Sequence, residues 1–200
     1  HLHVHSQYSI LDGQASIQRL VDKAMADGMP ALAITDHGNM FGIKEFFNYV
    51  AKKNSKTKGA IKDAEAAAKE AEQNGDAALA AQKRDEAESL RKKIFKPIFG
   101  CEVYVANETL DIHTDKHDTG RHLILLAKNE KGYHNLVKIV SKAWTDGFYS
   151  HPRTDKQEIA AHREGIIVCS ACLGGEIPKL ITAGEIEEAE TVSYTHLRAH

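Results

Sequence analysis

Three histidines alternate with apolar residues at the start of the chain, in the order His1-Leu2-His3-Val4-His5. If this segment is a strand, alternate side chains share one face, about 6.6 Å apart at ~3.3 Å rise per residue. Histidine is the side chain that most often binds metals. The row therefore predicts a site for one metal ion or an adjacent pair. The alternatives are a polar strand face exposed to water or a tag remnant, although a tag seldom alternates histidine with Leu and Val.

A further histidine follows the next expected strand, over residues 31–35. The apolar run ends in Asp36-His37-Gly38, and consecutive side chains on a strand point to opposite faces. We therefore predict His37 as a ligand and Asp36 as the group that orients a neighbouring ligand through a hydrogen bond. The alternative is a turn in which Asp36 caps a helix.

Three later residues have the same character. Glu102 lies between apolar neighbours, and a buried carboxylate is costly unless it binds a cation or pairs with Arg or Lys; both possibilities are open. His122 opens an apolar strand. Cys169 and Cys172 are suited to redox chemistry, zinc binding or packing, but the chain has only three cysteines, which excludes a four-cysteine zinc site. We predict Cys172 as a ligand.

The elements that position these residues alternate between short strands and amphipathic helices. Repeated β-α units favour an α/β fold with a parallel sheet or barrel, whose reactive residues gather at the carboxyl ends of strands. Strands are expected over residues 1–5, 31–35, 98–105, 122–127 and 165–170. Helices are expected over residues 16–27, 41–52, 132–143, 157–162 and 174–181.

Residues 51–94 interrupt this alternation. They contain no aromatic residue, and Asn74-Gly75-Asp76 is a turn signal, so we predict a helical hairpin over 61–73 and 77–93 with a thin alanine seam. The simplest interpretation is a solvated insertion without chemistry. From Lys52 to Lys96 there are 12 basic and 8 acidic residues, which leaves the remainder at −6.

Composition narrows the function further. The formal charge of −2 argues against a basic groove that holds nucleic acid through many phosphates, and no apolar run is long enough to span a membrane. Few cysteines suit a reducing cytosol, so we expect a cytoplasmic protein.

The chain opens with His and not Met, as expected of a piece of a longer protein. Residues 191–200 lose helical periodicity and are treated as a tail foreign to the fold, and we expect His113, His117 and His151 on the surface.

Taken together, several histidines, a carboxylate and an Asp at strand ends suit two or three closely spaced Zn²⁺ or Mn²⁺ ions. Such clusters hydrolyse phosphate esters, because one ion activates water while its neighbours stabilise charge on the attacking and leaving oxygens.

The motifs His-Leu-His-Val-His, Ile-Thr-Asp-His-Gly and Gly-Cys-Glu-Val-Tyr resemble those of the PHP (polymerase and histidinol phosphatase) superfamily. Further stretches resemble the PHP domain at the N-terminus of the bacterial DNA polymerase III alpha subunit, a C-family replicative polymerase; they are residues 5–13, 121–128, 132–136, 147–153 and 170–178.

The resemblance implies an incomplete, distorted (β/α)7 barrel over residues 1–190, with the 51–94 hairpin as an insertion and a trinuclear metal site. Asp12 enters as a ligand only through this resemblance, and relatives often have Asp in place of His1. The family's closing Asp-x-His motif is not in the chain. The ligands it implies are His3, His5, Asp12, His37, Glu102, His122 and Cys172, of which His3, His5, His37 and Glu102 would act catalytically through the metal.

By resemblance, the parent enzyme synthesises DNA with Mg²⁺, and this domain is a metal-dependent phosphoesterase, with 3′–5′ exonuclease proofreading as its expected activity. An alternative is a non-catalytic scaffold, stabilised by metal, that docks the proofreading exonuclease or another replisome subunit. A stand-alone phosphatase is disfavoured by the Gly132–Leu136 and Phe148–Arg153 stretches. The expected partners are DNA, through the parent polymerase, and replisome subunits, with no membrane.

Overall fold

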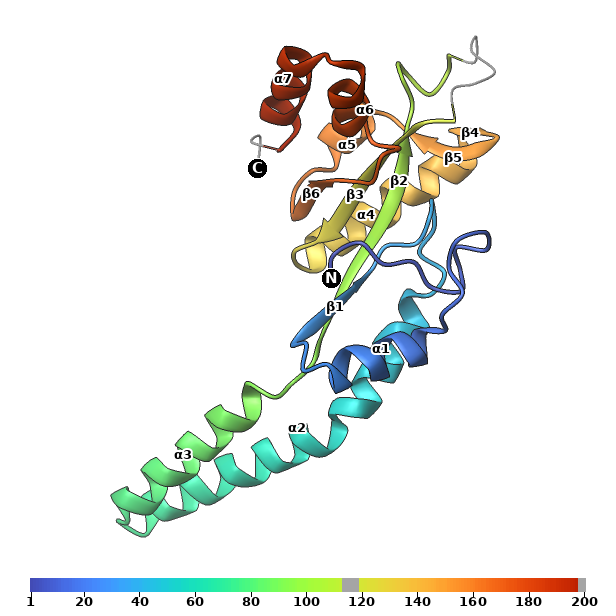
Figure 1. The fold of residues 1–200 in the computed structure, drawn as a ribbon. Helices are drawn as coiled ribbons and strands as arrows, with labels where there is room; N and C mark the ends of the chain where they lie inside the picture. Colours follow the sequence, from blue (N-terminus) through green and yellow to red (C-terminus); the bar gives the residue numbers. More distant parts are fainter. Residues whose placement is uncertain (113–118, 198–200) are drawn as a thin grey trace. The chain divides into compact units, whose positions relative to one another are not determined.

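The structure is a computed structural model that describes residues 1–112 and 119–197, and it divides into two compact units. The sheet unit contains residues 1–17, 33–43 and 98 onward, and the hairpin unit contains residues 18–32 and 44–97. His113, His117 and the last three residues of the expected tail lie outside the described residues. Figure 1 labels the elements.

The described strands form one mixed sheet in the order β4-β5-β2-β3-β6, with β1 also paired to β2. Neighbours β2–β3, β3–β6 and β4–β5 are antiparallel, and β2–β5 is parallel. The strands are β1 (Ala31–Ile34), β2 (Lys96–Val105), β3 (Arg121–Ala127), β4 (Phe148–Tyr149), β5 (His151–Thr154) and β6 (Ile166–Ser170).

The α/β class is therefore confirmed, but the expected parallel sheet is wrong. The described residues between β2 and β3 contain no helix, and a parallel neighbour needs a crossover connection that is usually helical. The chain instead turns back beside β2, so Tyr104 lies opposite His122 in antiparallel register. The short strands β4 and β5 were also not predicted, and His151, expected on the surface, is half-buried at the start of β5.

Four helices accompany the sheet. They are α4 (Glu130–Thr145), α5 (Lys156–Ala161), α6 (Glu176–Ala183) and α7 (Ile186–Leu197). Helix α4 packs along β3, β5 and β6, and the Asn129 side chain caps its first turn by accepting from Gly132 N. Helix α7 continues through Thr191 to Leu197, beyond the expected end of the periodic segment, because no Gly or Pro interrupts it.

The core of the sheet unit follows the two-residue period of the strands. Cys101, Val103 and Val105 of β2 are buried against Leu136 and Ile139 of α4. The intervening residues of β2 must therefore point to the opposite face. This alternation directs the side chains of Glu102 and Tyr104 away from the core, and that of Glu102 toward His3 and His5 at the start of the chain.

Residues 1–5 run beside β1 but do not form the predicted strand. The Ala33 and Thr35 amides donate to the His1 and Val4 carbonyls at 3.0 and 2.9 Å. The Val4 amide, however, donates to the Thr35 hydroxyl at 2.9 Å, so a side chain replaces the backbone acceptor and interrupts the ladder. The segment stays extended, and His3 and His5 still reach the same place, as alternation predicts.

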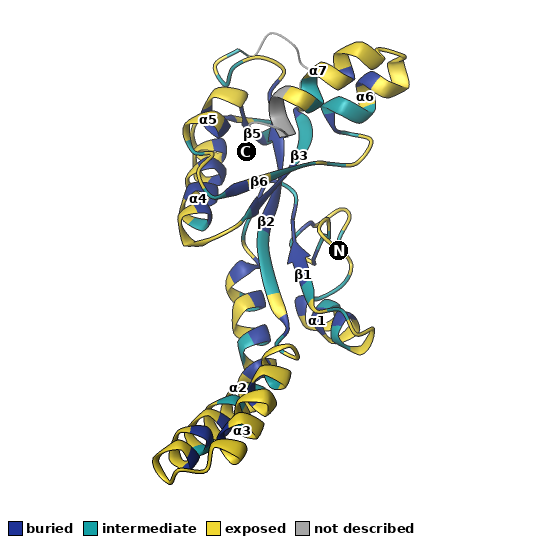
Figure 2. Ribbon diagram, turned by 90° about the vertical axis from the view of Figure 1, so that its left-hand side faces the viewer, coloured by how far each residue is buried: buried dark blue, intermediate teal, exposed yellow. Residues whose placement is uncertain are grey.

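The hairpin unit contains α1 (Ile17–Ala26, from Gln18 on), most of α2 (Ile43–Gln73), and α3 (Ala77–Arg91). The turn between α2 and α3 uses Gly75 at φ 78°, and the Asp76 side chain caps α3 by accepting from Leu79 N. The predicted alanine seam is confirmed, as the buried residues between α2 and α3 in Figure 2 show. They are Ala64, Ala68, Ala71, Ala80 and Ala87.

The base of the hairpin is held by one buried side chain. The Asn54 amide donates to Phe95 O at 2.8 Å, and its carbonyl accepts from Phe95 N at 3.1 Å. Helix α2 is continuous where two separate helices were predicted, because Gly59 is tolerated within it at a cost of about 1 kcal/mol. None of the helices among the described residues is long and apolar enough to cross a membrane.

Candidate metal centre

Glu102 lies at the centre of the candidate site. It projects from β2 on the face opposite the α4 core and is 0% exposed. Its backbone pairs with the segment after β1: Gly38 N donates to Glu102 O at 2.8 Å, and Glu102 N donates to Asp36 O at 3.1 Å. This pairing places His37 beside the carboxylate. In the described part of the chain, no Lys or Arg pairs with Glu102, so a cation partner of that kind does not explain its burial.

Four imidazoles surround the Glu102 carboxylate. Oε2 lies 3.1 Å from His3 Nε2, 2.9 Å from His5 Nε2 and 3.1 Å from His37 Nδ1. Oε1 lies 3.0 Å from His122 Nδ1. The ring nitrogens thus converge on both oxygens of one buried carboxylate, as expected where a carboxylate bridges metal ions.

The electrostatics of the group follow from this geometry. Burial by itself raises the pKa of the Glu102 carboxyl, but hydrogen bonds from His122 and His5 and the nearby His37 and His3 hold that pKa well below its usual range. Burial lowers the pKa of His5, and Glu102 outweighs it, so the pKa of His5 is raised overall. For His37, burial prevails and the pKa is lowered. A neutral imidazole is the form that binds a metal.

A buried relay orients His5. Asp36 is 2% exposed and accepts hydrogen bonds from Ser6 N, Ser6 Oγ and Ser9 Oγ at 2.6, 2.7 and 2.7 Å. Ser9 Oγ lies 3.0 Å from His5 Nδ1 and accepts from His37 N at 3.1 Å. Because the Ser9 hydroxyl gives its only proton to Asp36, His5 Nδ1 carries a proton, and in the neutral imidazole that binds a metal the lone pair of His5 Nε2 points into the site. Asp36 was predicted to orient a ligand through a hydrogen bond of its own; it instead contacts Ser6 and Ser9, and it reaches His5 only through Ser9.

Asp12 and Tyr104 border the same group. Asp12 Oδ2 lies 2.6 Å from His37 Nε2, so both ring nitrogens of His37 face carboxylates. The Tyr104 ring stacks on His37 with centroids 5.8 Å apart and meets His122 edge-on at 5.1 Å. Gly38, at φ 59°, leaves no room for a side chain, since a Cβ would lie 2.7 Å from Pro152 Cγ.

A loop after β6 brings Cys172 to the site. His122 N donates to Gly174 O at 3.1 Å, which holds the loop over the His122 ring. Cys172 Sγ lies 3.4 Å from His122 Nδ1 and 3.7 Å from Glu102 Oε1. Cys169 packs instead against the small cluster of Ala33, Ile124 and Leu126. The two cysteines therefore do not act as one pair.

The donors form two groups that share Glu102. One contains His3, His5 and Glu102, and the other contains His37, Glu102 and His122; within each group the ligand atoms lie within 4.8 Å of one another. Imidazole, carboxylate and thiolate donors suit Zn²⁺, and a site rich in His and carboxylate also suits Mn²⁺. A buried carboxylate without Lys or Arg but with four imidazoles fits such ions.

All seven predicted ligands lie in or beside this cluster, whereas His1 is exposed and in neither group. The sequence reasoning missed three residues that shape the site, namely Tyr104, Ser6 and Ser9. Tyr104 could have been predicted from the sequence, because Tyr104 lies two residues after Glu102 on the same strand and so shares the face of Glu102. The serines were not, since the fold of the 6–13 loop depends on hydrogen bonds to Asp36.

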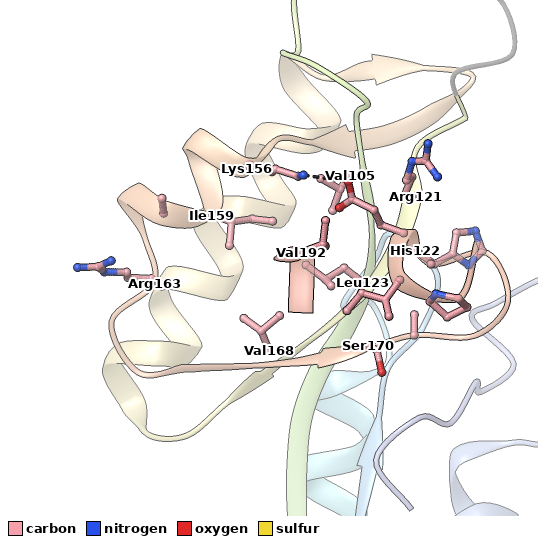
Figure 3. A pocket seen from close by; sticks show the side chains of 16 residues that line it. Val105, Arg121, His122, Leu123, Lys156, Ile159, Arg163, Val168, Ser170 and Val192 are labelled. Carbon is pink, nitrogen blue, oxygen red and sulfur yellow. Dashed lines mark hydrogen bonds and ion pairs between the residues drawn. The ribbon is translucent and has the colours of Figure 1, made fainter. Parts of the chain in front are cut away.

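An apolar cavity of about 230 Å³ adjoins His122. Its lining includes Val105, Leu123, Ile159 and Val168, with Arg121, Lys156 and Arg163 at its edge (Figure 3). Lys156 is paired with Glu176 at 3.0 Å.

The chain is similar to known proteins over nearly its whole length. A family model described as PHP domain matches residues 1–199. The chain is 42% identical over 193 residues to DNA polymerase III subunit alpha of Treponema pallidum, 39% over 193 residues to that of Borreliella burgdorferi, and 37% over 195 residues to that of Thermus aquaticus. These matches cover 95% of the chain but 13% of each relative. The resemblance found in the motifs is thereby confirmed, and the chain belongs to the PHP domain family.

Proposed function

We propose that this chain is the N-terminal PHP domain of a DNA polymerase III alpha subunit and that it binds two or three Zn²⁺ or Mn²⁺ ions. The observation that carries the metal site is the fully buried Glu102 among four imidazoles. The ligands would be His3, His5, Asp12, His37, Glu102, His122 and Cys172. An incomplete, distorted (β/α)7 barrel is the architecture that the family implies for them.

The proposed activity is hydrolysis of a phosphodiester, as in removal of a nucleotide from a 3′ end. Bound ions would supply Lewis-acid activation of water and neutralise charge on the phosphate oxygens. Glu102 would hold two ions close together, because it belongs to both donor groups. The relay from Asp36 through Ser9 holds the proton of His5 on Nδ1, away from the site. Tyr104 and Cys172 border the space that a substrate phosphate would enter.

The chain spans about an eighth of each relative's length. We propose that the parent protein is a cytoplasmic, Mg²⁺-dependent DNA-directed DNA polymerase whose partners are DNA and replisome subunits. Its polymerase carboxylates would lie outside these residues.

A scaffold is the second candidate, and a patch of exposed aromatic residues favours it. Phe41, Trp144 and Phe148 are 64, 42 and 52% exposed, and their rings lie 5.9 and 5.7 Å apart in succession. Exposed apolar patches commonly mark protein interfaces. In this alternative the metals stabilise the fold and the patch docks a replisome subunit, such as the proofreading exonuclease.

Metal analysis of the purified chain followed by a 3′–5′ exonuclease assay with Mn²⁺ or Zn²⁺ tests the proposal. We expect bound transition metal and metal-dependent cleavage, both lost in His37→Ala. The control is His134→Ala, which removes an exposed histidine of α4. A chain that binds no transition metal contradicts the site. Metal binding with cleavage that His37→Ala leaves unchanged contradicts catalysis and leaves the scaffold.

A further inference from the structure

The charges of the α2–α3 hairpin are segregated along its length. We define the hairpin base as residues 51–62 and 91–97, and the hairpin tip as residues 63–90. The tip has eight acidic and three basic residues. The base has nine basic residues and no acidic one: Lys52, Lys53, Lys56, Lys58, Lys62, Arg91, Lys92, Lys93 and Lys96.

Most of this positive charge is not neutralised within the protein. Lys53 pairs with Asp22 at 2.7 Å, and Arg91 pairs with Glu65 and Glu88. The other seven lysines are exposed, and none has an ion-pair partner among the residues that the structure describes. At the tip, by contrast, Lys83 and Arg84 are both paired, with Glu86 and Glu72.

The base is also a rigid support for these lysines. Asn54 ties α2 to the segment after α3 through both polar groups of Phe95, and the Arg91–Glu65 pair joins the two helices. Lys52 and Lys56, and likewise Lys58 and Lys62, are four residues apart, so each pair lies on one face of α2. From Lys52 to Lys62 the helix advances about 15 Å at 1.5 Å per residue.

The composition of the surface selects the partner. Residues 51–94 contain no Phe, Tyr or Trp, and Phe95 at the end of the base is buried. Single-stranded nucleic acid, by contrast, is bound by aromatic stacking, membranes are bound by an apolar helix face, and protein interfaces are enriched in aromatics and depleted in Lys. A surface of unpaired lysines without apolar anchors suits regularly spaced phosphates. Over ~15 Å, a DNA duplex presents roughly nine of them, at one charge per ~1.7 Å.

We propose that the hairpin base binds the phosphate backbone of duplex DNA without reading its sequence. None of the residues of the hairpin base belongs to the candidate metal centre, and the proposal goes beyond the hydrolytic function proposed for that centre. The proposal also revises the expectation, drawn from the net charge of −2, that the chain has no basic surface for nucleic acid. That net charge averages a positive base with a negative tip and an acidic remainder.

Fluorescence anisotropy of a labelled 20-base-pair duplex, measured with the 200-residue chain in EDTA, tests the proposal without metal or activity. We expect log K to fall with log salt at a slope of about −3, as for three or four phosphate contacts, which is roughly a sixty-fold loss between 50 and 200 mM salt. Lys58→Glu with Lys62→Glu should weaken binding at least ten-fold, whereas Lys58→Arg with Lys62→Arg should leave it unchanged.

The matched control is Lys69→Glu with Lys83→Glu at the tip, which makes the same change in net charge. We expect less than a three-fold effect. Lys52→Glu with Lys56→Glu provides a second test of the base, should the first pair unfold the hairpin. Equal losses from base and tip, or binding of polyglutamate as tight as binding of the duplex, would overturn the proposal, as would the absence of salt-dependent binding.

Discussion

Ser9 offers a sharp test of the site, because it touches the predicted ligands without being one. Its hydroxyl donates to Asp36 and accepts from the proton on His5 Nδ1 and from His37 N. Ser9→Ala removes these three hydrogen bonds with little change in volume. The proton of His5 can then move to Nε2, the nitrogen that faces the site, where it competes with a metal ion.

The magnitude follows from the contacts. Loss of the hydroxyl leaves the His37 amide without its acceptor and weakens the anchoring of Asp36, which costs about 2 kcal/mol of unfolding free energy at one to three per unsatisfied buried group. Outer-shell partners of metal ligands are typically worth 10–100-fold in metal affinity. We therefore expect Ser9→Ala to bind Zn²⁺ or Mn²⁺ 10–100-fold more weakly.

Ser6→Ala is the matched control. Ser6 is equally buried and its hydroxyl also donates to Asp36, at 2.7 Å, and accepts from Tyr8 N at 3.2 Å, but it has no hydrogen bond with His5 or His37. Urea unfolding in EDTA should show similar losses for both variants, whereas competition with a metal-sensitive dye should show weaker binding for Ser9→Ala alone. Equal metal affinities for the two variants would refute the relay.

Three further predictions concern other parts of the chain. Asn54→Ala should lower the free energy of unfolding by about 2–4 kcal/mol, because it leaves the buried Phe95 amide and carbonyl without hydrogen-bond partners. Hydrogen exchange at Phe95 should accelerate, while exchange in the sheet unit should be unaffected. The pKa of Glu102 is lowered from its ordinary value of 4.5, so in EDTA its charge stabilises the fold above that value and this contribution is lost as pH falls below it. The stability difference between the chain and Glu102→Gln, followed by chemical unfolding, should then narrow below pH 4.5 and not above it. In the metal-free chain, exposed Cys172 should alkylate faster than Cys169, and Zn²⁺ should protect Cys172 alone, as mass spectrometry of the labelled chain would show.

Local pattern predicted what depends on local geometry. Period-two alternation was sufficient to place His3 and His5 together and to turn Glu102 away from the apolar residues on either side of it. The alanine positions of residues 61–93 likewise predicted the hairpin, since a helical seam needs only regular spacing. In these cases the sequence carries the information because the neighbours that matter lie within a few residues.

Pairing between distant segments was harder to predict from the sequence. Nothing local indicates that β3 turns back beside β2, and the antiparallel pair rests on contacts such as Tyr104 opposite His122. The interruption of the ladder at Val4 depends on the Thr35 hydroxyl, 31 residues away. Asp12 was likewise reached through family resemblance and not through spacing, because a loop of hydrogen-bonded serines brings it to His37.

Strand β2 connects the core to the candidate site through a single register. A shift of one residue would exchange its two faces, placing Glu102 against the α4 core and exposing Cys101, Val103 and Val105 to the histidines. Apolar burial therefore fixes the position of the carboxylate, and ions bound at Glu102 would in turn favour the register that buries the apolar residues. Metal binding and core packing select the same arrangement of β2. It follows that a cavity in this core, as in Val103→Ala, should weaken metal binding even though Val103 points away from the site.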